Sequence, residues 1–416
     1  MKPYRRASGT EYWMISSAII ATLLLIAVAL TIKTSVQAHP LEQSTIEPAP
    51  KVEPAIDGVL DLFRQKSVVA LGDDHGLAQE EAFYIALIRD PRFAEEVGNV
   101  VVEFGGAASQ DIIDRYVNGE DVPLTELRRV WTETVGWIPG PTSLGYVNFY
   151  ADVRAVNLTL PPERRIKVWL GDPKIDWSTI NSVRDLAPYL AIRDDNFVSI
   201  IDDEILSKHK KALLIIGIGH LFSADGPGLL RDKINATYPG ALAVVSPFTG
   251  YIEPECNAKV AARAAGWPVP AVVAPVEGTW LKSELELPGC NYMPPDQLAL
   301  MAARPPGMRS EGPGNPPSAR EMEMNLLSGA TADAILYLGP PDSFIESPID
   351  PNIYLDPAYF KEENRRLKCC TFDGGTLDWT KLVQENSVIP KKIGVQPQLE
   401  FFGPKPGSKK KMSIPQ

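Results

Sequence analysis

The chain has 416 residues, a formal net charge of -11 and 44% hydrophobic residues. This length and composition suffice for one large domain with a buried core, and they exclude a fully disordered protein. The acidic balance excludes nucleic acid as an expected partner, because binding it needs a concentrated basic face. The only basic run, Lys409 to Lys411, lies in the terminal tail.

The amino terminus resembles an export segment. Basic residues near the start precede the uncharged run 12–32, which "SVQAHP" follows. Val36 and Ala38 have the spacing of a cleavage site before His39, yet the run is also about long enough to span a bilayer uncut. We therefore predict that residues 1–38 are a signal peptide or a transmembrane anchor. Either alternative places the rest of the chain outside the cytoplasm, in the periplasm or at the cell surface.

Residues 39–54 are rich in proline and polar residues and are predicted to form a linker. Short apolar runs then alternate with segments of helical spacing. The predicted strands are 67–72, 99–104, 165–171, 211–217, 241–246 and 333–339. The predicted helices are 77–90, 109–119, 123–135, 145–160, 194–209 and 226–238. This alternation predicts an α/β fold, with a mostly parallel sheet covered by helices on both faces.

The texture changes from about residue 254, where prolines become frequent. The α/β domain is expected to span 55–345 and to contain a flexible surface loop at 303–320. Residues 346–416 are expected to form a proline-rich extension, packed as far as about residue 370 and ending in a disordered tail.

Four cysteines are present, and no C-x-x-C pair occurs, so neither a zinc ribbon nor a thioredoxin motif is predicted. Cys256 and Cys290 could form a disulfide. The adjacent Cys369 and Cys370 are awkward partners for each other, because the ring would be tight. Free structural cysteines are the alternative for all four.

Polar residues collect at the ends of the predicted strands: Asp73, Asp74, His75, Glu103, Asp172 and His220. The carboxyl ends of parallel strands lie along one edge of a sheet, where ligands bind, so these side chains are expected to converge. Histidine supplies a base near neutral pH and a carboxylate can orient it, which are the parts for activating water. The same groups are possible metal ligands.

Each candidate also has a structural interpretation. Asp73 or Asp74 could simply cap the next helix. Glu103 lies in an apolar strand, where an unpaired carboxylate is costly, so a partner or a function is favoured over a solvated position. His75 alone could equally be a structural hydrogen-bonding residue. His220 favours a function, because the neighbouring glycines leave space around it.

Several catalytic motifs are absent from the sequence, namely the dinucleotide fingerprint, the P-loop, H-E-x-x-H and G-x-S-x-G. These absences exclude the usual serine hydrolase, classical zincin and kinase. Of the other histidines, His209 is predicted at a solvated helix end, and His39 in the linker has no predicted role.

Four motifs, "VVALGDDHG", "VVVEFG", "IRDDNFVSII" and "ALLIIGIGHL", occur in this order and are separated by helices. Together they resemble the erythromycin esterase-like, ChaN-like and Tiki/TraB-like superfamily over about residues 56–250. The resemblance implies that His75, Glu103 and His220 form the active-site set. Arg193 and Asp194 would line the same cleft.

One position departs from this pattern, because Asp73 stands where members of the superfamily usually have glutamate. The carboxylate is kept, but its reach is one methylene shorter, which places a metal or substrate geometry taken from relatives in doubt. If Asp73 is that carboxylate, Asp74 is the candidate helix cap.

The superfamily includes macrolide esterases that activate water with a histidine, metal-dependent proteases, and haem- or iron-binding uptake lipoproteins. A fold does not choose among these. Our first hypothesis is an exported hydrolase of the erythromycin esterase-like type that acts on a small-molecule or peptide substrate. In it His75 is the general base, Glu103 and Asp73 orient and polarise the water, and His220 with Arg193 stabilises the oxyanion.

Two variants remain open. A divalent metal held by His75, Glu103 and His220 could assist the water, whereas a haem- or iron-binding protein without catalysis would use a histidine as an axial ligand. The substrate side of the site is expected to include Arg193, Asp194, Asp172 and Trp131. Trp131 and Trp137 could wall an apolar pocket or belong to the core.

Overall fold

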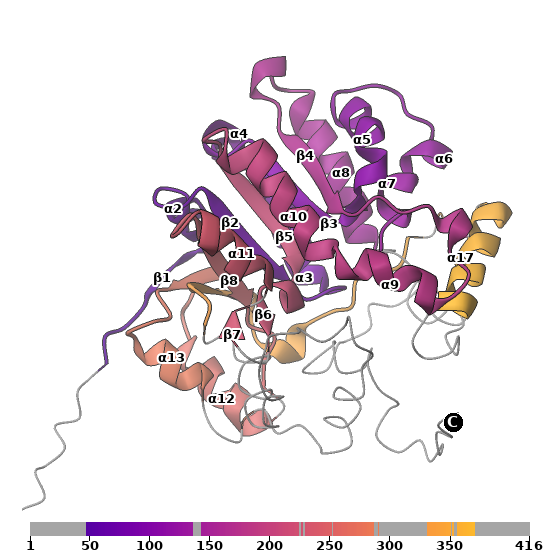
Figure 1. The fold of residues 1–416 in the computed structure, drawn as a ribbon. Helices are drawn as coiled ribbons and strands as arrows, with labels where there is room; N and C mark the ends of the chain where they lie inside the picture. The colour runs from indigo at the N-terminus through magenta and orange to yellow at the C-terminus, as the bar shows by residue number, and fades with distance from the viewer. Residues whose placement is uncertain are drawn as a thin grey trace, which may run out of the picture. The chain divides into compact units, whose positions relative to one another are not determined.

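The centre of the fold is an eight-stranded sheet in the order β1-β9-β10-β8-β2-β5-β3-β4 (Figure 1). The pairs from β10 to β4 are parallel, whereas β9 is antiparallel to both β10 and β1. The strands are β1 (Lys51–Pro54), β2 (Val68–Asp73), β3 (Asn99–Gly106), β4 (Lys167–Asp172), β5 (Ala212–Gly217), β8 (Leu242–Pro247), β9 (Ala271–Ala274) and β10 (Ala334–Tyr337). A separate two-stranded ribbon is formed by β6 (Phe222–Ser223) and β7 (Gly226–Pro227). The predicted α/β fold with a mostly parallel sheet is confirmed.

The computed structural model describes residues 47–135, 143–223, 226–227, 229–251, 253–286, 290, 331–350, 352 and 356–370. The predicted export segment, most of the predicted linker, the loop at 303–320 and the predicted tail lie outside these residues. Among the helices that are described, none is both long enough and apolar enough to cross a bilayer.

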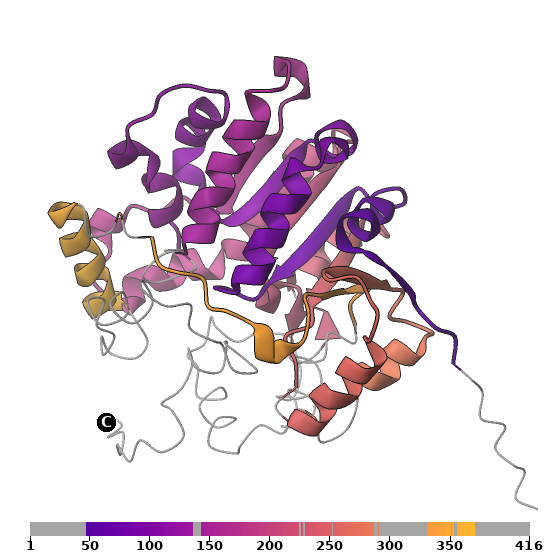
Figure 2. The same ribbon diagram turned by 180° about the vertical axis from the view of Figure 1, so that it is seen from behind.

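Helices cover both faces of the sheet (Figures 1 and 2). Val69 and Leu71 of β2 belong to one buried cluster with α2, α3, α5 and α8, whereas Val68 and Ala70 belong to a second cluster with α10, α11, α12 and α13. This alternation follows the two-residue period of a strand, so a strand that is covered on both faces is apolar throughout. The helices are α2 (Ala55–Leu62), α3 (Ala78–Arg89), α4 (Pro91–Glu96), α5 (Gln110–Val117), α6 (Leu124–Leu127), α7 (Arg129–Thr132), α8 (Leu144–Asn157), α9 (Val183–Ala191), α10 (Arg193–Ile201), α11 (Leu229–Thr237), α12 (Pro254–Arg263), α13 (Trp280–Leu285) and α17 (Pro357–Cys370).

The structure differs from the predicted elements at several places. Residues 51–54 were expected at the end of the linker, but they form the edge strand β1. The first and last residues of this strand, Lys51 and Pro54, are exposed, so its sequence lacks the apolar run of a buried strand. The single helix predicted at 123–135 is divided into α6 and α7. The helix predicted at 194–209 ends earlier, because α10 passes into a π-helical turn at 202–206.

The chain beyond the predicted domain end at residue 345 returns to the carboxyl edge of the sheet. Glu346 bridges to Leu77, and the backbone amide of Ser347 donates to the Gly76 carbonyl at 2.7 Å. This return segment therefore holds the turn that follows β2.

Both possible disulfides are present. Cys256 pairs with Cys290, and Cys369 pairs with its neighbour Cys370. The prediction that the adjacent cysteines are awkward partners is wrong. The pair occupies the last two residues of α17, and carbonyls in the last turn of a helix have no intrahelical partner to preserve.

Candidate functional site

The candidate site lies at the carboxyl ends of four neighbouring strands, β2, β5, β3 and β4. Asp73 is the last residue of β2, Glu103 lies near the end of β3, and Asp172 ends β4. His220 closes the short 3₁₀ turn that follows β5. The parallel topology thus brings together residues that are far apart in the sequence.

His75 is held by a buried carboxylate. Its Nδ1 lies 2.8 Å from Oδ2 of Asp73, which is 1% exposed. The hydroxyls of Tyr146 and Tyr84 also donate to Asp73, at 2.5 Å and 3.0 Å. Burial first, and then the charge of Asp73, raises the pKa of both tyrosines well above the usual range, so they remain protonated donors. With Nδ1 held by Asp73, Nε2 of His75 faces Glu103.

Glu103 is faced by both histidines. Its Oε2 lies 3.7 Å from Nε2 of His75, and its Oε1 lies 3.5 Å from Nε2 of His220. Glu103 is 7% exposed, and it accepts hydrogen bonds from the Gly217 amide and from Nη2 of Arg193. Burial alone would raise its pKa, but Arg193 and the two histidines outweigh burial and hold it well below the usual range. Glu103 is therefore an anion that lies between two imidazoles.

The His220 side contains a fixed cation. Nδ1 of His220 contacts Asp194, and Nε2 lies 3.2 Å from Nη1 of Arg193. Nε of Arg193 donates to Oδ1 of Asp172 at 2.7 Å. When His220 is neutral, Nε2 can accept from Arg193, and when it is protonated, Nε2 can donate to Glu103. His220 thus has a hydrogen-bond partner in either protonation state.

The two histidines are more basic than a free imidazole. Burial lowers the pKa of His75, but the charges of Glu103 and Asp73 outweigh burial and raise it to about 9. For His220, burial is likewise outweighed by Glu103 and by the hydrogen bond to Asp194, and the pKa is raised. At neutral pH the resting site therefore holds His75 mainly as a cation.

Glycine is required where β5 ends. A Cβ on Gly217 would lie 2.8 Å from Nε2 of His75 and 2.9 Å from Oε2 of Glu103. Only a residue without a Cβ lets this backbone approach the two side chains so closely. The side chains of His75 and His220 keep exposed fractions of 29% and 17%, so both remain accessible to solvent at this edge.

The sequence reasoning missed several polar groups behind His75. Tyr84 and Tyr146 lie on α3 and α8, where their ring character indicated only core packing. Glu81, in the first turn of α3, accepts from the Ser143 hydroxyl, and burial raises its pKa to about 7. A possible signal was the acidic pair so close to "GDDHG", although such a pair usually marks a solvated helix start.

The prediction that Asp74 caps the following helix is wrong. The residue before α3 is Leu77, and no side chain caps this helix. Gly76, at a φ of +88°, instead turns the chain before the helix begins. The backbone amide of Asp74 donates to Oε2 of Glu80 at 2.9 Å.

The metal variant does not fit this arrangement. In the part of the chain that the structure describes, no group of three or more histidine, cysteine or acidic side chains is placed to hold a metal ion. Arg193 contacts both Oε1 of Glu103 and Nε2 of His220, so its guanidinium occupies the position that a metal shared by these two atoms would need.

The remaining predicted residues lie elsewhere. Trp131 is 2% exposed and stacks on Tyr150 in the core, with ring centroids 6.2 Å apart. It therefore does not line an open substrate pocket. His209 is exposed after the π-helical turn. Trp137 and His39 lie outside the described residues.

No family model matches the chain, and no curated protein matches its sequence. Among solved structures, a Bacillus cereus protein aligns with a TM-score of 0.40 at 11% identity and covers 70% of this chain and 94% of its own. The type III effector HopBA1 aligns with a TM-score of 0.30 at 14% identity, over 49% of this chain and 90% of its own. The ChaN structure from Campylobacter jejuni, described as showing cofacial haem binding, aligns with a TM-score of 0.27 at 12% identity, over 47% and 86%. Alignments at these scores assign neither a family nor a function, so the resemblance drawn from the motifs stays a prediction.

Proposed function

We propose that this protein is a hydrolase that cleaves an ester or amide bond of a small molecule or peptide with an activated water. One observation carries the proposal: Nε2 atoms of two aspartate-held histidines face the same buried glutamate at a solvent-accessible edge of the sheet. Neither a serine nucleophile nor a resident metal is needed for this chemistry.

In the proposed reaction, neutral His75 takes a proton from water at Nε2 while the water oxygen bonds to the carbonyl carbon. Asp73 fixes Nδ1, and the negative charge of Glu103 stabilises the imidazolium that forms. Arg193 is the permanent cation near the developing oxyanion, and His220 can donate a hydrogen bond to it from Nε2 when His220 is protonated. His75 then returns the proton to the leaving oxygen or nitrogen as the scissile bond breaks.

The raised pKa of His75 sets the pH dependence of this proposal. The base form is scarce at neutral pH and becomes the main form above about 9. We therefore expect the rate of hydrolysis to rise with pH towards that value, because the neutral fraction of His75 increases.

The test uses the full chain with p-nitrophenyl acetate as a probe ester and matched histidine-to-asparagine variants. His75→Asn should lower kcat by about 10²–10⁴. His220→Asn should lower it by about 10²–10³. His209→Asn is the control, because this exposed histidine lies outside the site and should leave kcat unchanged.

Haem addition provides an independent measurement that bears on the alternative of a haem-binding protein. A Soret band that appears with haem and is lost in His75→Asn, together with wild-type ester cleavage by that variant, would contradict the hydrolase. Loss of cleavage in folded His75→Asn and His220→Asn, with no haem band, would support it.

A further inference from the structure

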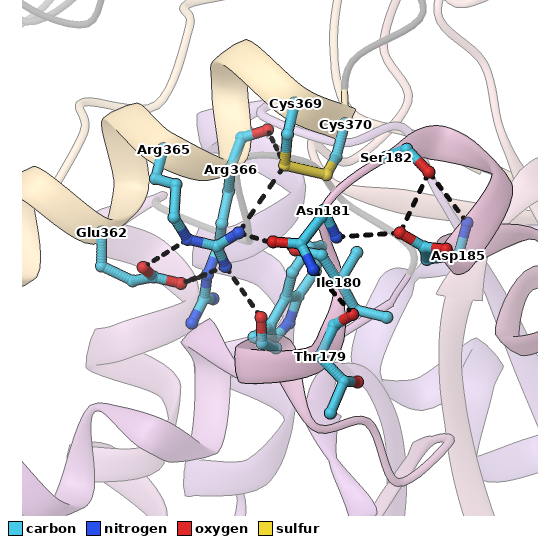
Figure 3. Close-up of a disulfide and its surroundings, with 11 residues drawn as sticks. Thr179, Ile180, Asn181, Ser182, Asp185, Glu362, Arg365, Arg366, Cys369 and Cys370 are labelled. Carbon is cyan, nitrogen blue, oxygen red and sulfur yellow. Dashed lines mark hydrogen bonds and ion pairs between the residues drawn. A yellow bond between two sulfur atoms is a disulfide. The ribbon is translucent and has the colours of Figure 1, made fainter.

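Helix α17 lies across the loop that follows β4 (Figure 3). Arg365 donates from Nη1 to the Ile180 carbonyl at 2.6 Å and from Nη2 to the Trp177 carbonyl at 2.8 Å. The Glu362 carboxylate accepts hydrogen bonds from Nε and Nη2 of Arg365, both at 2.7 Å, and so fixes the guanidinium. Bidentate pairing of this kind holds the arginine in one orientation.

Arg366, the next residue of the helix, contacts the end of α7. Nη1 of Arg366 donates to the Thr132 carbonyl at 2.6 Å, and its guanidinium lies 4.6 Å from the centre of the Trp177 ring. Nε1 of Trp177 in turn donates to the Thr134 carbonyl at 3.2 Å. Segment 132–135 is therefore held from α17 both directly and through Trp177.

Segment 132–135 contacts the candidate site through Asp172. The Val135 amide donates to Oδ2 of Asp172, which is 0% exposed. Oδ1 of Asp172 accepts a hydrogen bond from Nε of Arg193 at 2.7 Å, and Nη2 of Arg193 donates to Oε1 of Glu103. A short series of hydrogen bonds thus leads from α17 to the carboxylate that both histidines face.

The Cys369–Cys370 disulfide closes the end of this helix. Cys370 is 0% exposed and packs with Val135, Trp177 and Ile180, among others. The sulfur of Cys369 lies 3.9 Å from Nη1 of Arg365. A bridge between neighbours restricts the backbone at both residues, and opening it restores that freedom.

We propose that α17 is a latch, formed by Glu362, Arg365, Arg366, Cys369 and Cys370, which positions Asp172 and Arg193, and that the Cys369–Cys370 disulfide locks it. A dithiol opens the lock: the S–S bond breaks, the two cysteine sulfurs gain two electrons and two protons, and the dithiol leaves as its own cyclic disulfide. The inference rests on the hydrolase site proposed above, but it can be measured without turnover.

The test compares the full chain with a Cys369→Ser/Cys370→Ser double variant by amide hydrogen exchange. Exchange in segments 132–135 and 177–180 should become about tenfold faster or more, because the carbonyls of these segments lose their fixed donors and the backbone opens more often. The histidine NMR titration of His220 should move to higher pH by about 0.5, as the charge of Arg193 moves away. The Cys256→Ser/Cys290→Ser double variant is the control and should leave both measurements unchanged.

Two further experiments keep the inference falsifiable if the double variant folds poorly. Arg366→Met keeps both disulfides and should show the same exchange pattern, with kcat for p-nitrophenyl acetate lowered and KM retained. Dithiothreitol added to the Cys256→Ser/Cys290→Ser variant, which keeps only the adjacent pair, should reproduce the faster exchange reversibly.

The outcomes separate the two proposals. If exchange and the His220 titration equal those of the wild type in both Arg366→Met and the reduced protein, the latch is overturned, whatever the chain hydrolyses. If exchange changes as expected but the wild type cleaves no ester, the latch stands and the hydrolase fails.

Discussion

Both histidines of the site are held by an aspartate, but the groups around them differ. Asp73, which holds His75, receives two tyrosine hydroxyls, whereas His220 touches the guanidinium of Arg193. Neutral hydroxyls fix an orientation without adding charge, and a guanidinium adds a charge that persists at every accessible pH. The His75 side therefore has no permanent cation of its own, whereas the His220 side keeps the charge of Arg193 when His220 titrates. Variants that remove one support at a time test this difference.

The largest effect is expected from Arg193→Gln. This change leaves Glu103 and Asp172 buried without their cation, which should lower the free energy of unfolding by about 3–5 kcal/mol. Urea unfolding measures the loss. Arg89→Gln is the control, because its ion pair with Asp152 is exposed and should contribute about 1 kcal/mol or less. Equal losses in the two variants would contradict the role given to Arg193.

Asp73→Asn should lower the pKa of His75 from about 9 by about 1–3, since one of the two charges that raise it is removed while Glu103 remains. In the wild type, the stabilisation from this pair is complete below the unfolded pKa of about 6.5 and is lost as pH rises through about 9. In the variant the loss begins at lower pH. Histidine NMR titration and urea unfolding at several pH values measure both effects, and an unchanged titration would refute the pairing.

Gly217→Ala should lower the free energy of unfolding by about 1–3 kcal/mol, because the new methyl group must displace His75 or Glu103. Thermal unfolding measures the loss. Gly219→Ala offers a close comparison, since a Cβ at that position meets nothing within 4 Å. A larger loss at Gly219 than at Gly217 would mean that the crowding described here does not limit stability.

The smallest effect is expected from Tyr146→Phe, which removes one donor to Asp73 and keeps the ring stacked on Phe104 at 4.3 Å. Stability should fall by about 0.5–1.5 kcal/mol and the His75 titration should move. Tyr150→Phe removes a hydrogen bond to the Phe104 carbonyl instead, so it should cost similar stability while the titration stays in place.

The positions of polar residues at the ends of the predicted strands were sufficient to predict which residues converge, because neighbouring parallel strands place their carboxyl ends together. Asp73, His75, Glu103 and His220 were named on that ground, and the structure brings them to adjacent strands. The polar groups of α3 and α8 could not be predicted in the same way. A helix residue such as Tyr146 shows the same periodicity whether its hydroxyl meets a carboxylate or water.

Short-range sequence signals failed where distant segments decide the structure. Asp74 precedes a helix as a cap would, but the turn at Gly76 moves the helix start beyond its reach. Strand β9 is short and lies between prolines, and its antiparallel partners come from both ends of the described domain. Cys370 packs in a cluster with Val135 and Trp177 from distant parts of the chain, which no local pattern around the cysteines indicates.

The return segment that bridges Leu77 to Glu346 also constrains the order of assembly. During synthesis the turn carrying His75 emerges early, but its backbone partner at Ser347 emerges roughly 270 residues later. The histidine turn therefore gains this backbone partner only after nearly the whole domain has been synthesised. A nascent chain cut before this segment would keep the sheet-forming sequences from β2 to β10 and would lack a closed active edge.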